Sequence, residues 1–314
     1  MHLFAALVAL TIPVAAPVPP GAGGATDLTP IFPDGTSISL GIDIKGVMKS
    51  PLGKQVVGDD KPFDAARKLL KVLFPVEGAL PVEGDAGKAV AAVANRLNRV
   101  TVAAEPKGES FVIYLEGEIA EGDYVRAAEE LAKIGNREFR TEKQGERKLV
   151  IIGDGTAYGV ELSAGLFLIA SRKELLDEVR DKHAGKKKAA IDKLLAERLK
   201  TVKTAETPVW LAIGELKFEG VAELANDLSG LVATISLKAD ADIRVVGDYA
   251  TEEQARKSEG TLKMLLGFLP LIGGDDQMKV WRAANITVKQ DGKTVTATGS
   301  IPAEMLARGY AKQK

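Results

Sequence analysis

Short apolar runs separated by tight turns are the feature that most constrains how this chain can fold. Three such runs cover residues 148–152, 158–162 and 166–170, and turns containing Gly155 and Gly165 lie between them. Two-residue turns join antiparallel neighbours, whereas parallel strands need a crossover of a dozen or more residues. The pattern therefore predicts an antiparallel meander and argues against a doubly wound parallel sheet.

Strands with one buried face are predicted elsewhere by a period of two in hydrophobicity. The period is clearest in residues 38–45, where Ile and Leu alternate with Ser, Gly, Asp and Lys. By the same reasoning we expect further strands at residues 100–104, 111–119, 209–213, 233–238, 242–250, 280–290 and 293–299.

Helices are predicted between these strands, because apolar residues there recur at helical spacing. Two of them begin with a capping box, formed by Ser171 with Glu174 and by Thr251 with Gln254. The sequence thus predicts an α+β fold of antiparallel sheets, made of hairpins and meanders, with helices on one face. The expected helices cover residues 61–74, 88–97, 123–134, 171–185, 189–200, 221–228, 251–269 and 302–308.

The order of elements repeats and predicts two related α+β halves, residues 26–205 and residues 206–314. Each half has an opening strand, helical material, a hairpin, a helix and then a further hairpin or meander. Alignment of the two central segments places Gly117 on Gly247, and the first half carries an extra helical insert at residues 51–97. An internal duplication is the preferred interpretation, and two generic strand–helix units are the alternative.

The first 25 residues have the pattern of a secretory signal peptide. Residues 3–18 are almost wholly apolar, a Pro/Gly/Ala run follows, and charged residues begin at Asp27. A spanning helix needs about 20 apolar residues, and this shorter run is broken by Pro13. We therefore expect export to the periplasm or the extracellular space, cleavage after Ala25 in preference to Ala16, and no stable membrane span afterwards. A retained N-terminal membrane anchor and a buried apolar N-terminus are the alternatives.

Composition argues against several classes of function. The net charge of −1 shows no excess of positive charge of the kind that binds nucleic acid. The chain has no cysteine, which rules out disulfides, thiolate catalysis and zinc–thiolate sites. His183 is the one histidine beyond position 2, and it falls in the last turn of a predicted helix, where a cation suits the helix dipole. We therefore expect no catalytic residue, no cofactor and no metal ion.

Two motifs that resemble ligand-binding loops have structural interpretations. Residues 153–159 (GDGTAYG) follow a strand, but the next element is another strand, whereas phosphate binding needs a helix N-terminus there. A hairpin turn is therefore expected. Asp240 with Asp242, and the pair at positions 275–276, lack the spacing of a calcium-binding loop and fit turns.

Tyr114, Glu116 and Glu118 share one face of the predicted strand at residues 111–119. Paired carboxylates can serve glycoside hydrolysis, which leaves a carboxylate-only hydrolase as the least favoured function. Because Leu115 and Ile119 occupy the other face, we interpret the acidic face as exposed to solvent.

The densest apolar clusters beyond the leader are residues 209–211 and 265–272. Core packing is the structural interpretation of both. The functional alternative is a cavity for an apolar ligand, with Trp210, Leu266 and Phe268 as its lining. The sequence therefore predicts an exported, non-enzymatic binding or scaffold protein. The alternative is a periplasmic carrier of a lipid-like molecule, so the expected partner is an apolar small molecule or a protein.

The stretch LGIDIKGVMKSPLGKQV, which begins at Leu40, and the closing stretch GSIPAEMLARG resemble exported hypothetical proteins of planctomycete-type bacteria. The resemblance covers most of the chain after the leader. It implies an exported protein, and it implies no mechanism, because such proteins have no established activity.

Overall fold

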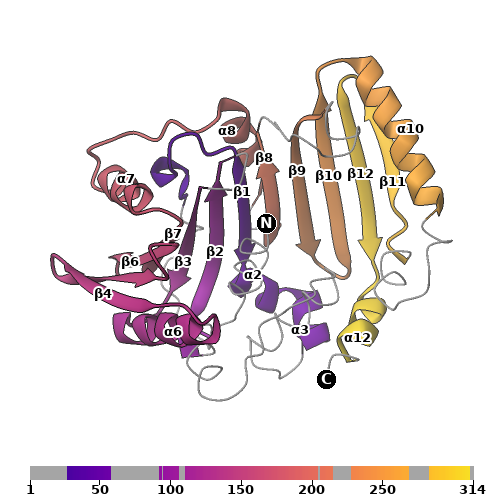
Figure 1. Ribbon diagram of the computed structural model, residues 1–314. Helices are drawn as coiled ribbons and strands as arrows, with labels where there is room; N and C mark the ends of the chain where they lie inside the picture. Colours follow the sequence, from indigo (N-terminus) through magenta and orange to yellow (C-terminus); the bar gives the residue numbers. More distant parts are fainter. Residues whose placement is uncertain are drawn as a thin grey trace.

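One antiparallel sheet organises the residues that the computed structural model describes, which are 27–57, 92–93, 95–105, 110–203, 206–214, 228–268 and 283–311 (Figure 1). Its strands are β1 (Ile38–Asp43), β2 (Leu97–Ala104), β3 (Phe111–Gly117), β4 (Phe139–Gln144), β5 (Arg147–Ile152), β6 (Ala157–Ser163), β7 (Leu166–Ala170), β8 (Val209–Ile213), β9 (Leu228–Leu237), β10 (Ala241–Tyr249), β11 (Thr287–Asp291) and β12 (Thr294–Ile301).

The sheet runs without a break through the boundary expected near residue 206. β1 and β8 pair at its centre, with Ile38 opposite Ile213. From there the strands follow the order β1-β2-β3-β7-β6-β5-β4 in one direction and β8-β9-β10-β12-β11 in the other. On both sides a helix follows the third strand along the chain, and the last strand returns to pair with that third strand.

Helices lie on both faces of the sheet, and the prediction that they cover one face is wrong. On β3, Ile113 and Leu115 pack in the cluster that contains α6, whereas Val112 and Tyr114 pack in the cluster that contains α7. We call these two sides of the sheet the α6 face and the α7 face. The helices are η1 (Thr29–Ile31), α2 (Ile44–Lys49), α3 (Pro51–Val57), α6 (Glu121–Ile134), α7 (Lys173–His183), α8 (Lys193–Leu199), α10 (Glu252–Phe268) and α12 (Ala303–Ala311).

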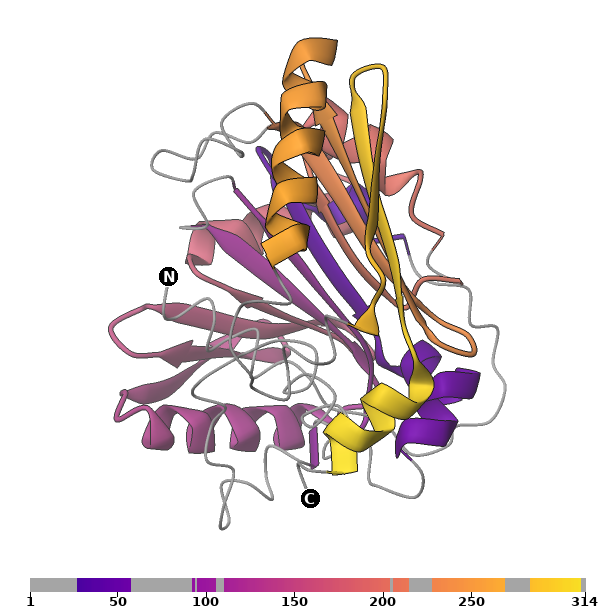
Figure 2. The same cartoon turned by 90° about the vertical axis from the view of Figure 1, so that its right-hand side faces the viewer.

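The second half of the sheet has one apolar and one polar face. α10 lies along β11 and β12 (Figure 2), and its Ala255 packs with Val288 and Val295 on the α6 face. Alternate residues of the same strands point to the α7 face and are mostly polar: Thr234, Ser236, Asp242, Arg244, Thr296 and Thr298. This alternation is typical of an antiparallel sheet that is covered on one side.

Several local predictions are confirmed. The meander of β5, β6 and β7 is present, and residues 153–156 form a turn in which Gly153 and Gly155 have positive φ. Thr251 and Gln254 form the reciprocal cap of α10. The cap expected at Ser171 is absent, because its hydroxyl instead accepts a hydrogen bond from the backbone N–H of Phe111 at 3.1 Å.

Other elements differ from the prediction. The sequence did not indicate β4 or α2, α3 lies at the start of the predicted helical insert, and α8 begins at Lys193 rather than near residue 189. Leu228, expected at the end of a helix, begins β9. The leader at residues 1–25, the helix at 61–74, the acidic pair at 275–276, half of the helix at 88–97 and most of the helix at 221–228 lie outside the described residues.

Candidate functional site

Five apolar side chains on the α6 face form what we call the mid-sheet patch: Leu211, Ile213, Leu231, Ala233 and Val245. The strand register places them side by side, with Leu211 opposite Ala233, Ala233 opposite Val245, and Ile213 opposite Leu231. All five are half-buried, although they lie in interior strands of a wide sheet. Apolar side chains at such positions are normally covered, so this patch is the candidate binding surface.

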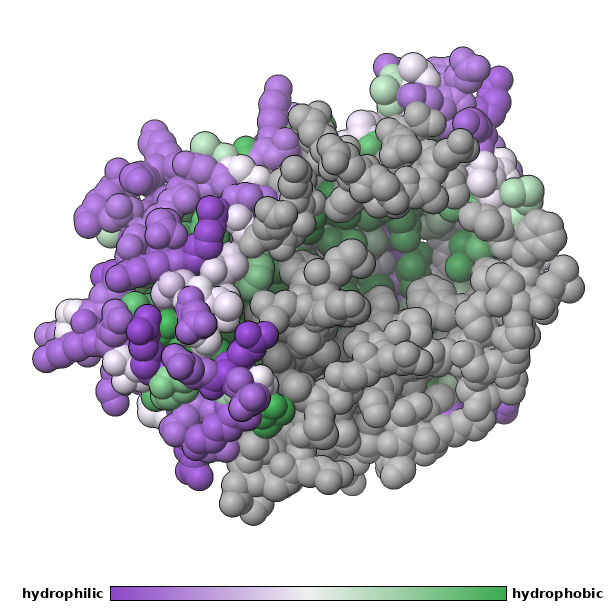
Figure 3. All heavy atoms as spheres, in the orientation of Figure 1, coloured by the Kyte–Doolittle hydropathy of each residue, from purple (hydrophilic) through white to green (hydrophobic). Residues whose placement is uncertain are grey.

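The buried clusters of the described residues surround the mid-sheet patch on three sides without including it. Leu40 on β1 packs against the cluster at α6, Ile235 belongs to the cluster at α3 and α12, and Val295 belongs to the cluster under α10. In Figure 3, hydrophobic residues are visible at the bottom of a hollow over this half of the sheet.

The three residues predicted to line one cavity do not come together. Trp210 lies on the α7 face of β8, where it is almost fully buried. Leu266 belongs to α10 and packs beside the cluster on the α6 face. The side chain of Phe268 lies outside the described residues. The sequence indicated which residues are apolar, but the sheet separates Trp210 from Leu266.

Of the three residues on the predicted acidic face, Tyr114 and Glu116 are largely buried, whereas Glu118, just beyond the end of β3, is exposed. Tyr114 is 0% exposed, and its hydroxyl donates to the carbonyl oxygen of Ile31 at 2.9 Å. Burial raises the pKa of Tyr114 well above its ordinary value of 10.0, so the hydroxyl remains a donor. Glu116 accepts a hydrogen bond from Arg99 at 3.4 Å, in an ion pair whose side chains are mostly buried. The interpretation is therefore wrong for Tyr114, which packs in the cluster that contains η1 and α7, and for Glu116, but it holds for Glu118, which is exposed.

Glu116, Glu118 and His183 line one open pocket of about 780 Å³ beside η1. Glu116 is engaged by Arg99, and His183 is the exposed last residue of α7. Within the described ranges, no group of three or more His, Asp and Glu residues is placed to hold a metal ion. Asp240 accepts a hydrogen bond from the backbone N–H of Ala303 at 2.9 Å. It therefore has a structural role, which is to cap α12.

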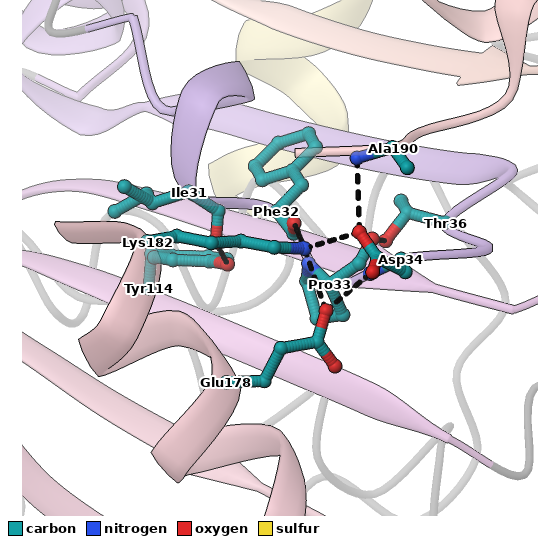
Figure 4. Close-up of polar contacts among 9 residues, drawn as sticks. All are labelled: Ile31, Phe32, Pro33, Asp34, Thr36, Tyr114, Glu178, Lys182 and Ala190. Carbon is teal, nitrogen blue, oxygen red and sulfur yellow. Dashed lines mark hydrogen bonds and ion pairs between the residues drawn. The ribbon is translucent and has the colours of Figure 1, made fainter. Parts of the chain in front are cut away.

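A buried ammonium group joins the N-terminal segment to α7 (Figure 4). The side chain of Lys182 is 0% exposed. Its Nζ donates to Phe32 O at 2.7 Å, to Asp34 Oδ1 at 2.6 Å and to Glu178 Oε1 at 2.6 Å. These three contacts use all three donors of the ammonium. The network fixes the residues around η1 against α7, and these residues form one wall of two pockets.

The Asp34 carboxylate should make part of the stability depend on pH. The hydrogen bond from Lys182, with a further one from the N–H of Ala190, lowers the pKa of Asp34 below its ordinary value of 3.8. A lowered folded-state pKa contributes stability that is present above the ordinary value and is lost as the pH falls through the folded value. In urea unfolding, the stability difference between the native sequence and Asp34→Asn should therefore be largest near neutral pH. It should shrink below about pH 4, and a difference that is constant from pH 7 to pH 3 would contradict this.

Comparisons with known proteins give a fold and no family. No family model matches the chain, and no curated protein matches it. The solved structures of the Treponema protein TP0453 are similar in fold. Crystal form III superposes with a TM-score of 0.54 at 8% identity, covering 92% of this chain and 100% of the other. Form IV gives a TM-score of 0.50 at 11% identity, over 90% and 96% of the two chains.

The helices in the described part of the chain are too short or too polar to cross a membrane.

Proposed function

We propose that this protein is an exported binding protein that carries an apolar small molecule against the mid-sheet patch. One observation carries the proposal: five apolar side chains at the centre of the sheet are half-buried, whereas apolar clusters on three sides are closely packed. An apolar ligand that lies on these side chains would remove their remaining surface from water, at about 25 cal/mol per Å². Export is part of the proposal and rests on the apolar leader at residues 3–18.

The chemistry of the patch suits a hydrocarbon chain or ring. Its five members carry no polar side-chain atom, so they offer contact surface and no directional hydrogen bond. Specificity on such a surface comes from shape and contact area, and each further methylene that the patch covers is expected to strengthen binding by about 0.8 kcal/mol. A non-enzymatic scaffold is the alternative, and it predicts a purified protein without any bound small molecule.

The first test compares the mass of the purified protein under native and denaturing conditions. An extra non-covalent mass that partitions into organic solvent is the expected result. A bare polypeptide that also fails to bind N-phenyl-1-naphthylamine, an uncharged apolar fluorescent probe, would overturn the carrier proposal and favour a scaffold.

A pair of adjacent substitutions locates the binding surface. Ala233 belongs to the mid-sheet patch on the α6 face, whereas the next residue of β9, Thr234, points to the α7 face. Ala233→Phe should fill the space over the patch and weaken probe binding at least 10-fold, which corresponds to about 1.4 kcal/mol. Thr234→Phe adds the same ring on the other face and should leave the affinity unchanged. Equal effects of the two substitutions on affinity would place the probe elsewhere.

We also infer that the two halves arose by duplication. The inference is supported by the matching strand order on either side of the β1–β8 pair. In both halves the helix that follows the third strand packs on the α6 face. The residues aligned in sequence, Gly117 and Gly247, both occur in the last three residues of that third strand.

A further inference from the structure

A separate pocket lies on the α7 face of the sheet, opposite to the mid-sheet patch. It has a volume of about 320 Å³, within the range of small-molecule sites. Its floor is formed by sheet residues Ser39, Arg99, Thr101 and Trp210. The segments around η1 and α8 supply the rest of the lining, which is mainly apolar: Leu28, Phe32, Ile191, Ala196, Leu199 and Val202.

The hydroxyl of Ser39 is the observation that points to a ligand. Ser39 is 1% exposed, and its Oγ has no hydrogen-bond partner among the described residues. A buried hydroxyl without a partner is costly, and such groups in native proteins usually have a reason. Since Ser39 lines the pocket, a polar group of a bound molecule can supply the missing partner.

The charges around the pocket favour an uncharged ligand. The guanidinium of Arg99 lies 3.4 Å from the carboxylate of Glu116 and 4.0 Å from that of Asp43, so two anions already balance it. A ligand anion would compete with both carboxylates. The other charged lining residues, Asp27 and Lys200, are exposed, and water screens their interactions.

Aromatic surfaces give the pocket its shape. A methyl group placed on Gly41 would lie 1.8 Å from the indole ring of Trp210, which means that this ring lies directly on the backbone of β1. The ring is thereby held in one position, and Phe32 contributes a second aromatic side chain to the lining. Fixed aromatic rings with one or two hydrogen-bonding groups are the usual composition of a site for a small aromatic molecule.

We propose that this pocket binds an uncharged aromatic alcohol of one or two rings, whose hydroxyl pairs with Ser39 and whose ring packs against Trp210. The site is independent of the mid-sheet patch, since the sheet lies between them.

Fluorine NMR of 4-fluorophenol, titrated with the full chain, tests the proposal. We expect saturable binding with a Kd near 1 mM, which is the affinity expected of so small a ligand. Fluorobenzene, which lacks the hydroxyl, should bind to the native protein about five-fold more weakly than 4-fluorophenol does. The Ser39→Ala variant should likewise bind 4-fluorophenol about five-fold more weakly than the native protein does. The charged analogue 4-fluorobenzoate should bind more weakly than 4-fluorophenol.

Two neighbouring positions on α8 provide the blocking variant and its control. Ala196→Phe fills the pocket and should abolish saturable binding, whereas Glu197→Phe, at an exposed position, should leave it unchanged. Ala233→Phe, on the α6 face, should leave the affinity for 4-fluorophenol unchanged. Failure of the proposal for this pocket can therefore be distinguished from failure of the apolar-carrier proposal. The proposal is overturned if 4-fluorophenol does not bind, if fluorobenzene binds equally well, or if Ser39→Ala leaves the affinity unchanged.

Discussion

Replacement of Lys182 by methionine is expected to lower the free energy of unfolding by about 3 kcal/mol. The ammonium is fully buried and donates to Phe32, Asp34 and Glu178. Methionine fills the space of the apolar stem but leaves the buried carbonyl oxygen of Phe32 without its donor and removes the cation that pairs with the Asp34 and Glu178 carboxylates. Such a loss is large because an unpaired buried group carries its full desolvation cost. Urea unfolding followed by circular dichroism measures it.

Lys186→Met is the matched control for this prediction. Its ammonium also pairs with a carboxylate, that of Asp181 at 3.2 Å, but the lysine side chain is 70% exposed. Exposed ion pairs contribute little, so the control should lose less than about 0.5 kcal/mol. A loss at Lys182 no greater than the loss at Lys186 would mean that the buried network does not hold the N-terminal segment in place.

Replacement of Gly41 by alanine is expected to cost about 3 kcal/mol, although it adds one methyl group. That methyl group would lie 1.8 Å from Cζ2 of Trp210, which is far closer than any real contact. The indole is 6% exposed and cannot move without disturbing its neighbours. The measurement is again urea unfolding, with a red shift of tryptophan emission as a second sign that the ring has moved.

A double-mutant cycle separates this clash from a general effect of alanine in the strand. In a Trp210→Ala background, Gly41→Ala should cost nothing or stabilise slightly, because alanine is favoured over glycine inside a strand. Gly260→Ala on α10 provides a further control. A methyl group there meets nothing within 4 Å, and the change should stabilise the helix by about 0.5–1 kcal/mol. An equal cost of Gly41→Ala in both backgrounds would contradict the explanation.

The secondary structure that was predicted correctly depends on local signals. β5, β6 and β7 are short apolar runs between glycine turns, and a hairpin needs only neighbouring residues to form. β4 was missed because its sequence, FRTEKQ, has no apolar alternation. It pairs with one neighbour at the edge of the sheet, where charged side chains protect against pairing with other chains. A strand of this kind is defined by its partner rather than by its own residues.

The candidate sites could be predicted only in part. The apolar character of Trp210 and Leu266 was evident, yet they lie on opposite faces of the sheet. The alternation within residues 209–213 gives the relative faces of Trp210 and Leu211, but not which helices cover each face. No role was predicted for Lys182. Its spacing of four residues from Glu178 was a usable signal, whereas Phe32 is 150 residues away.

The sequence by itself determined the antiparallel class of the sheet, most of its hairpins and the capped start of α10, because turn chemistry, hydrophobic period and capping act over a few residues. Only the tertiary structure decided which face each apolar side chain occupies, how β1 meets β8, and where the mid-sheet patch and the buried Lys182 network lie. These features depend on pairings between residues distant in the chain. Their free energy comes from packing and desolvation, which local sequence does not encode.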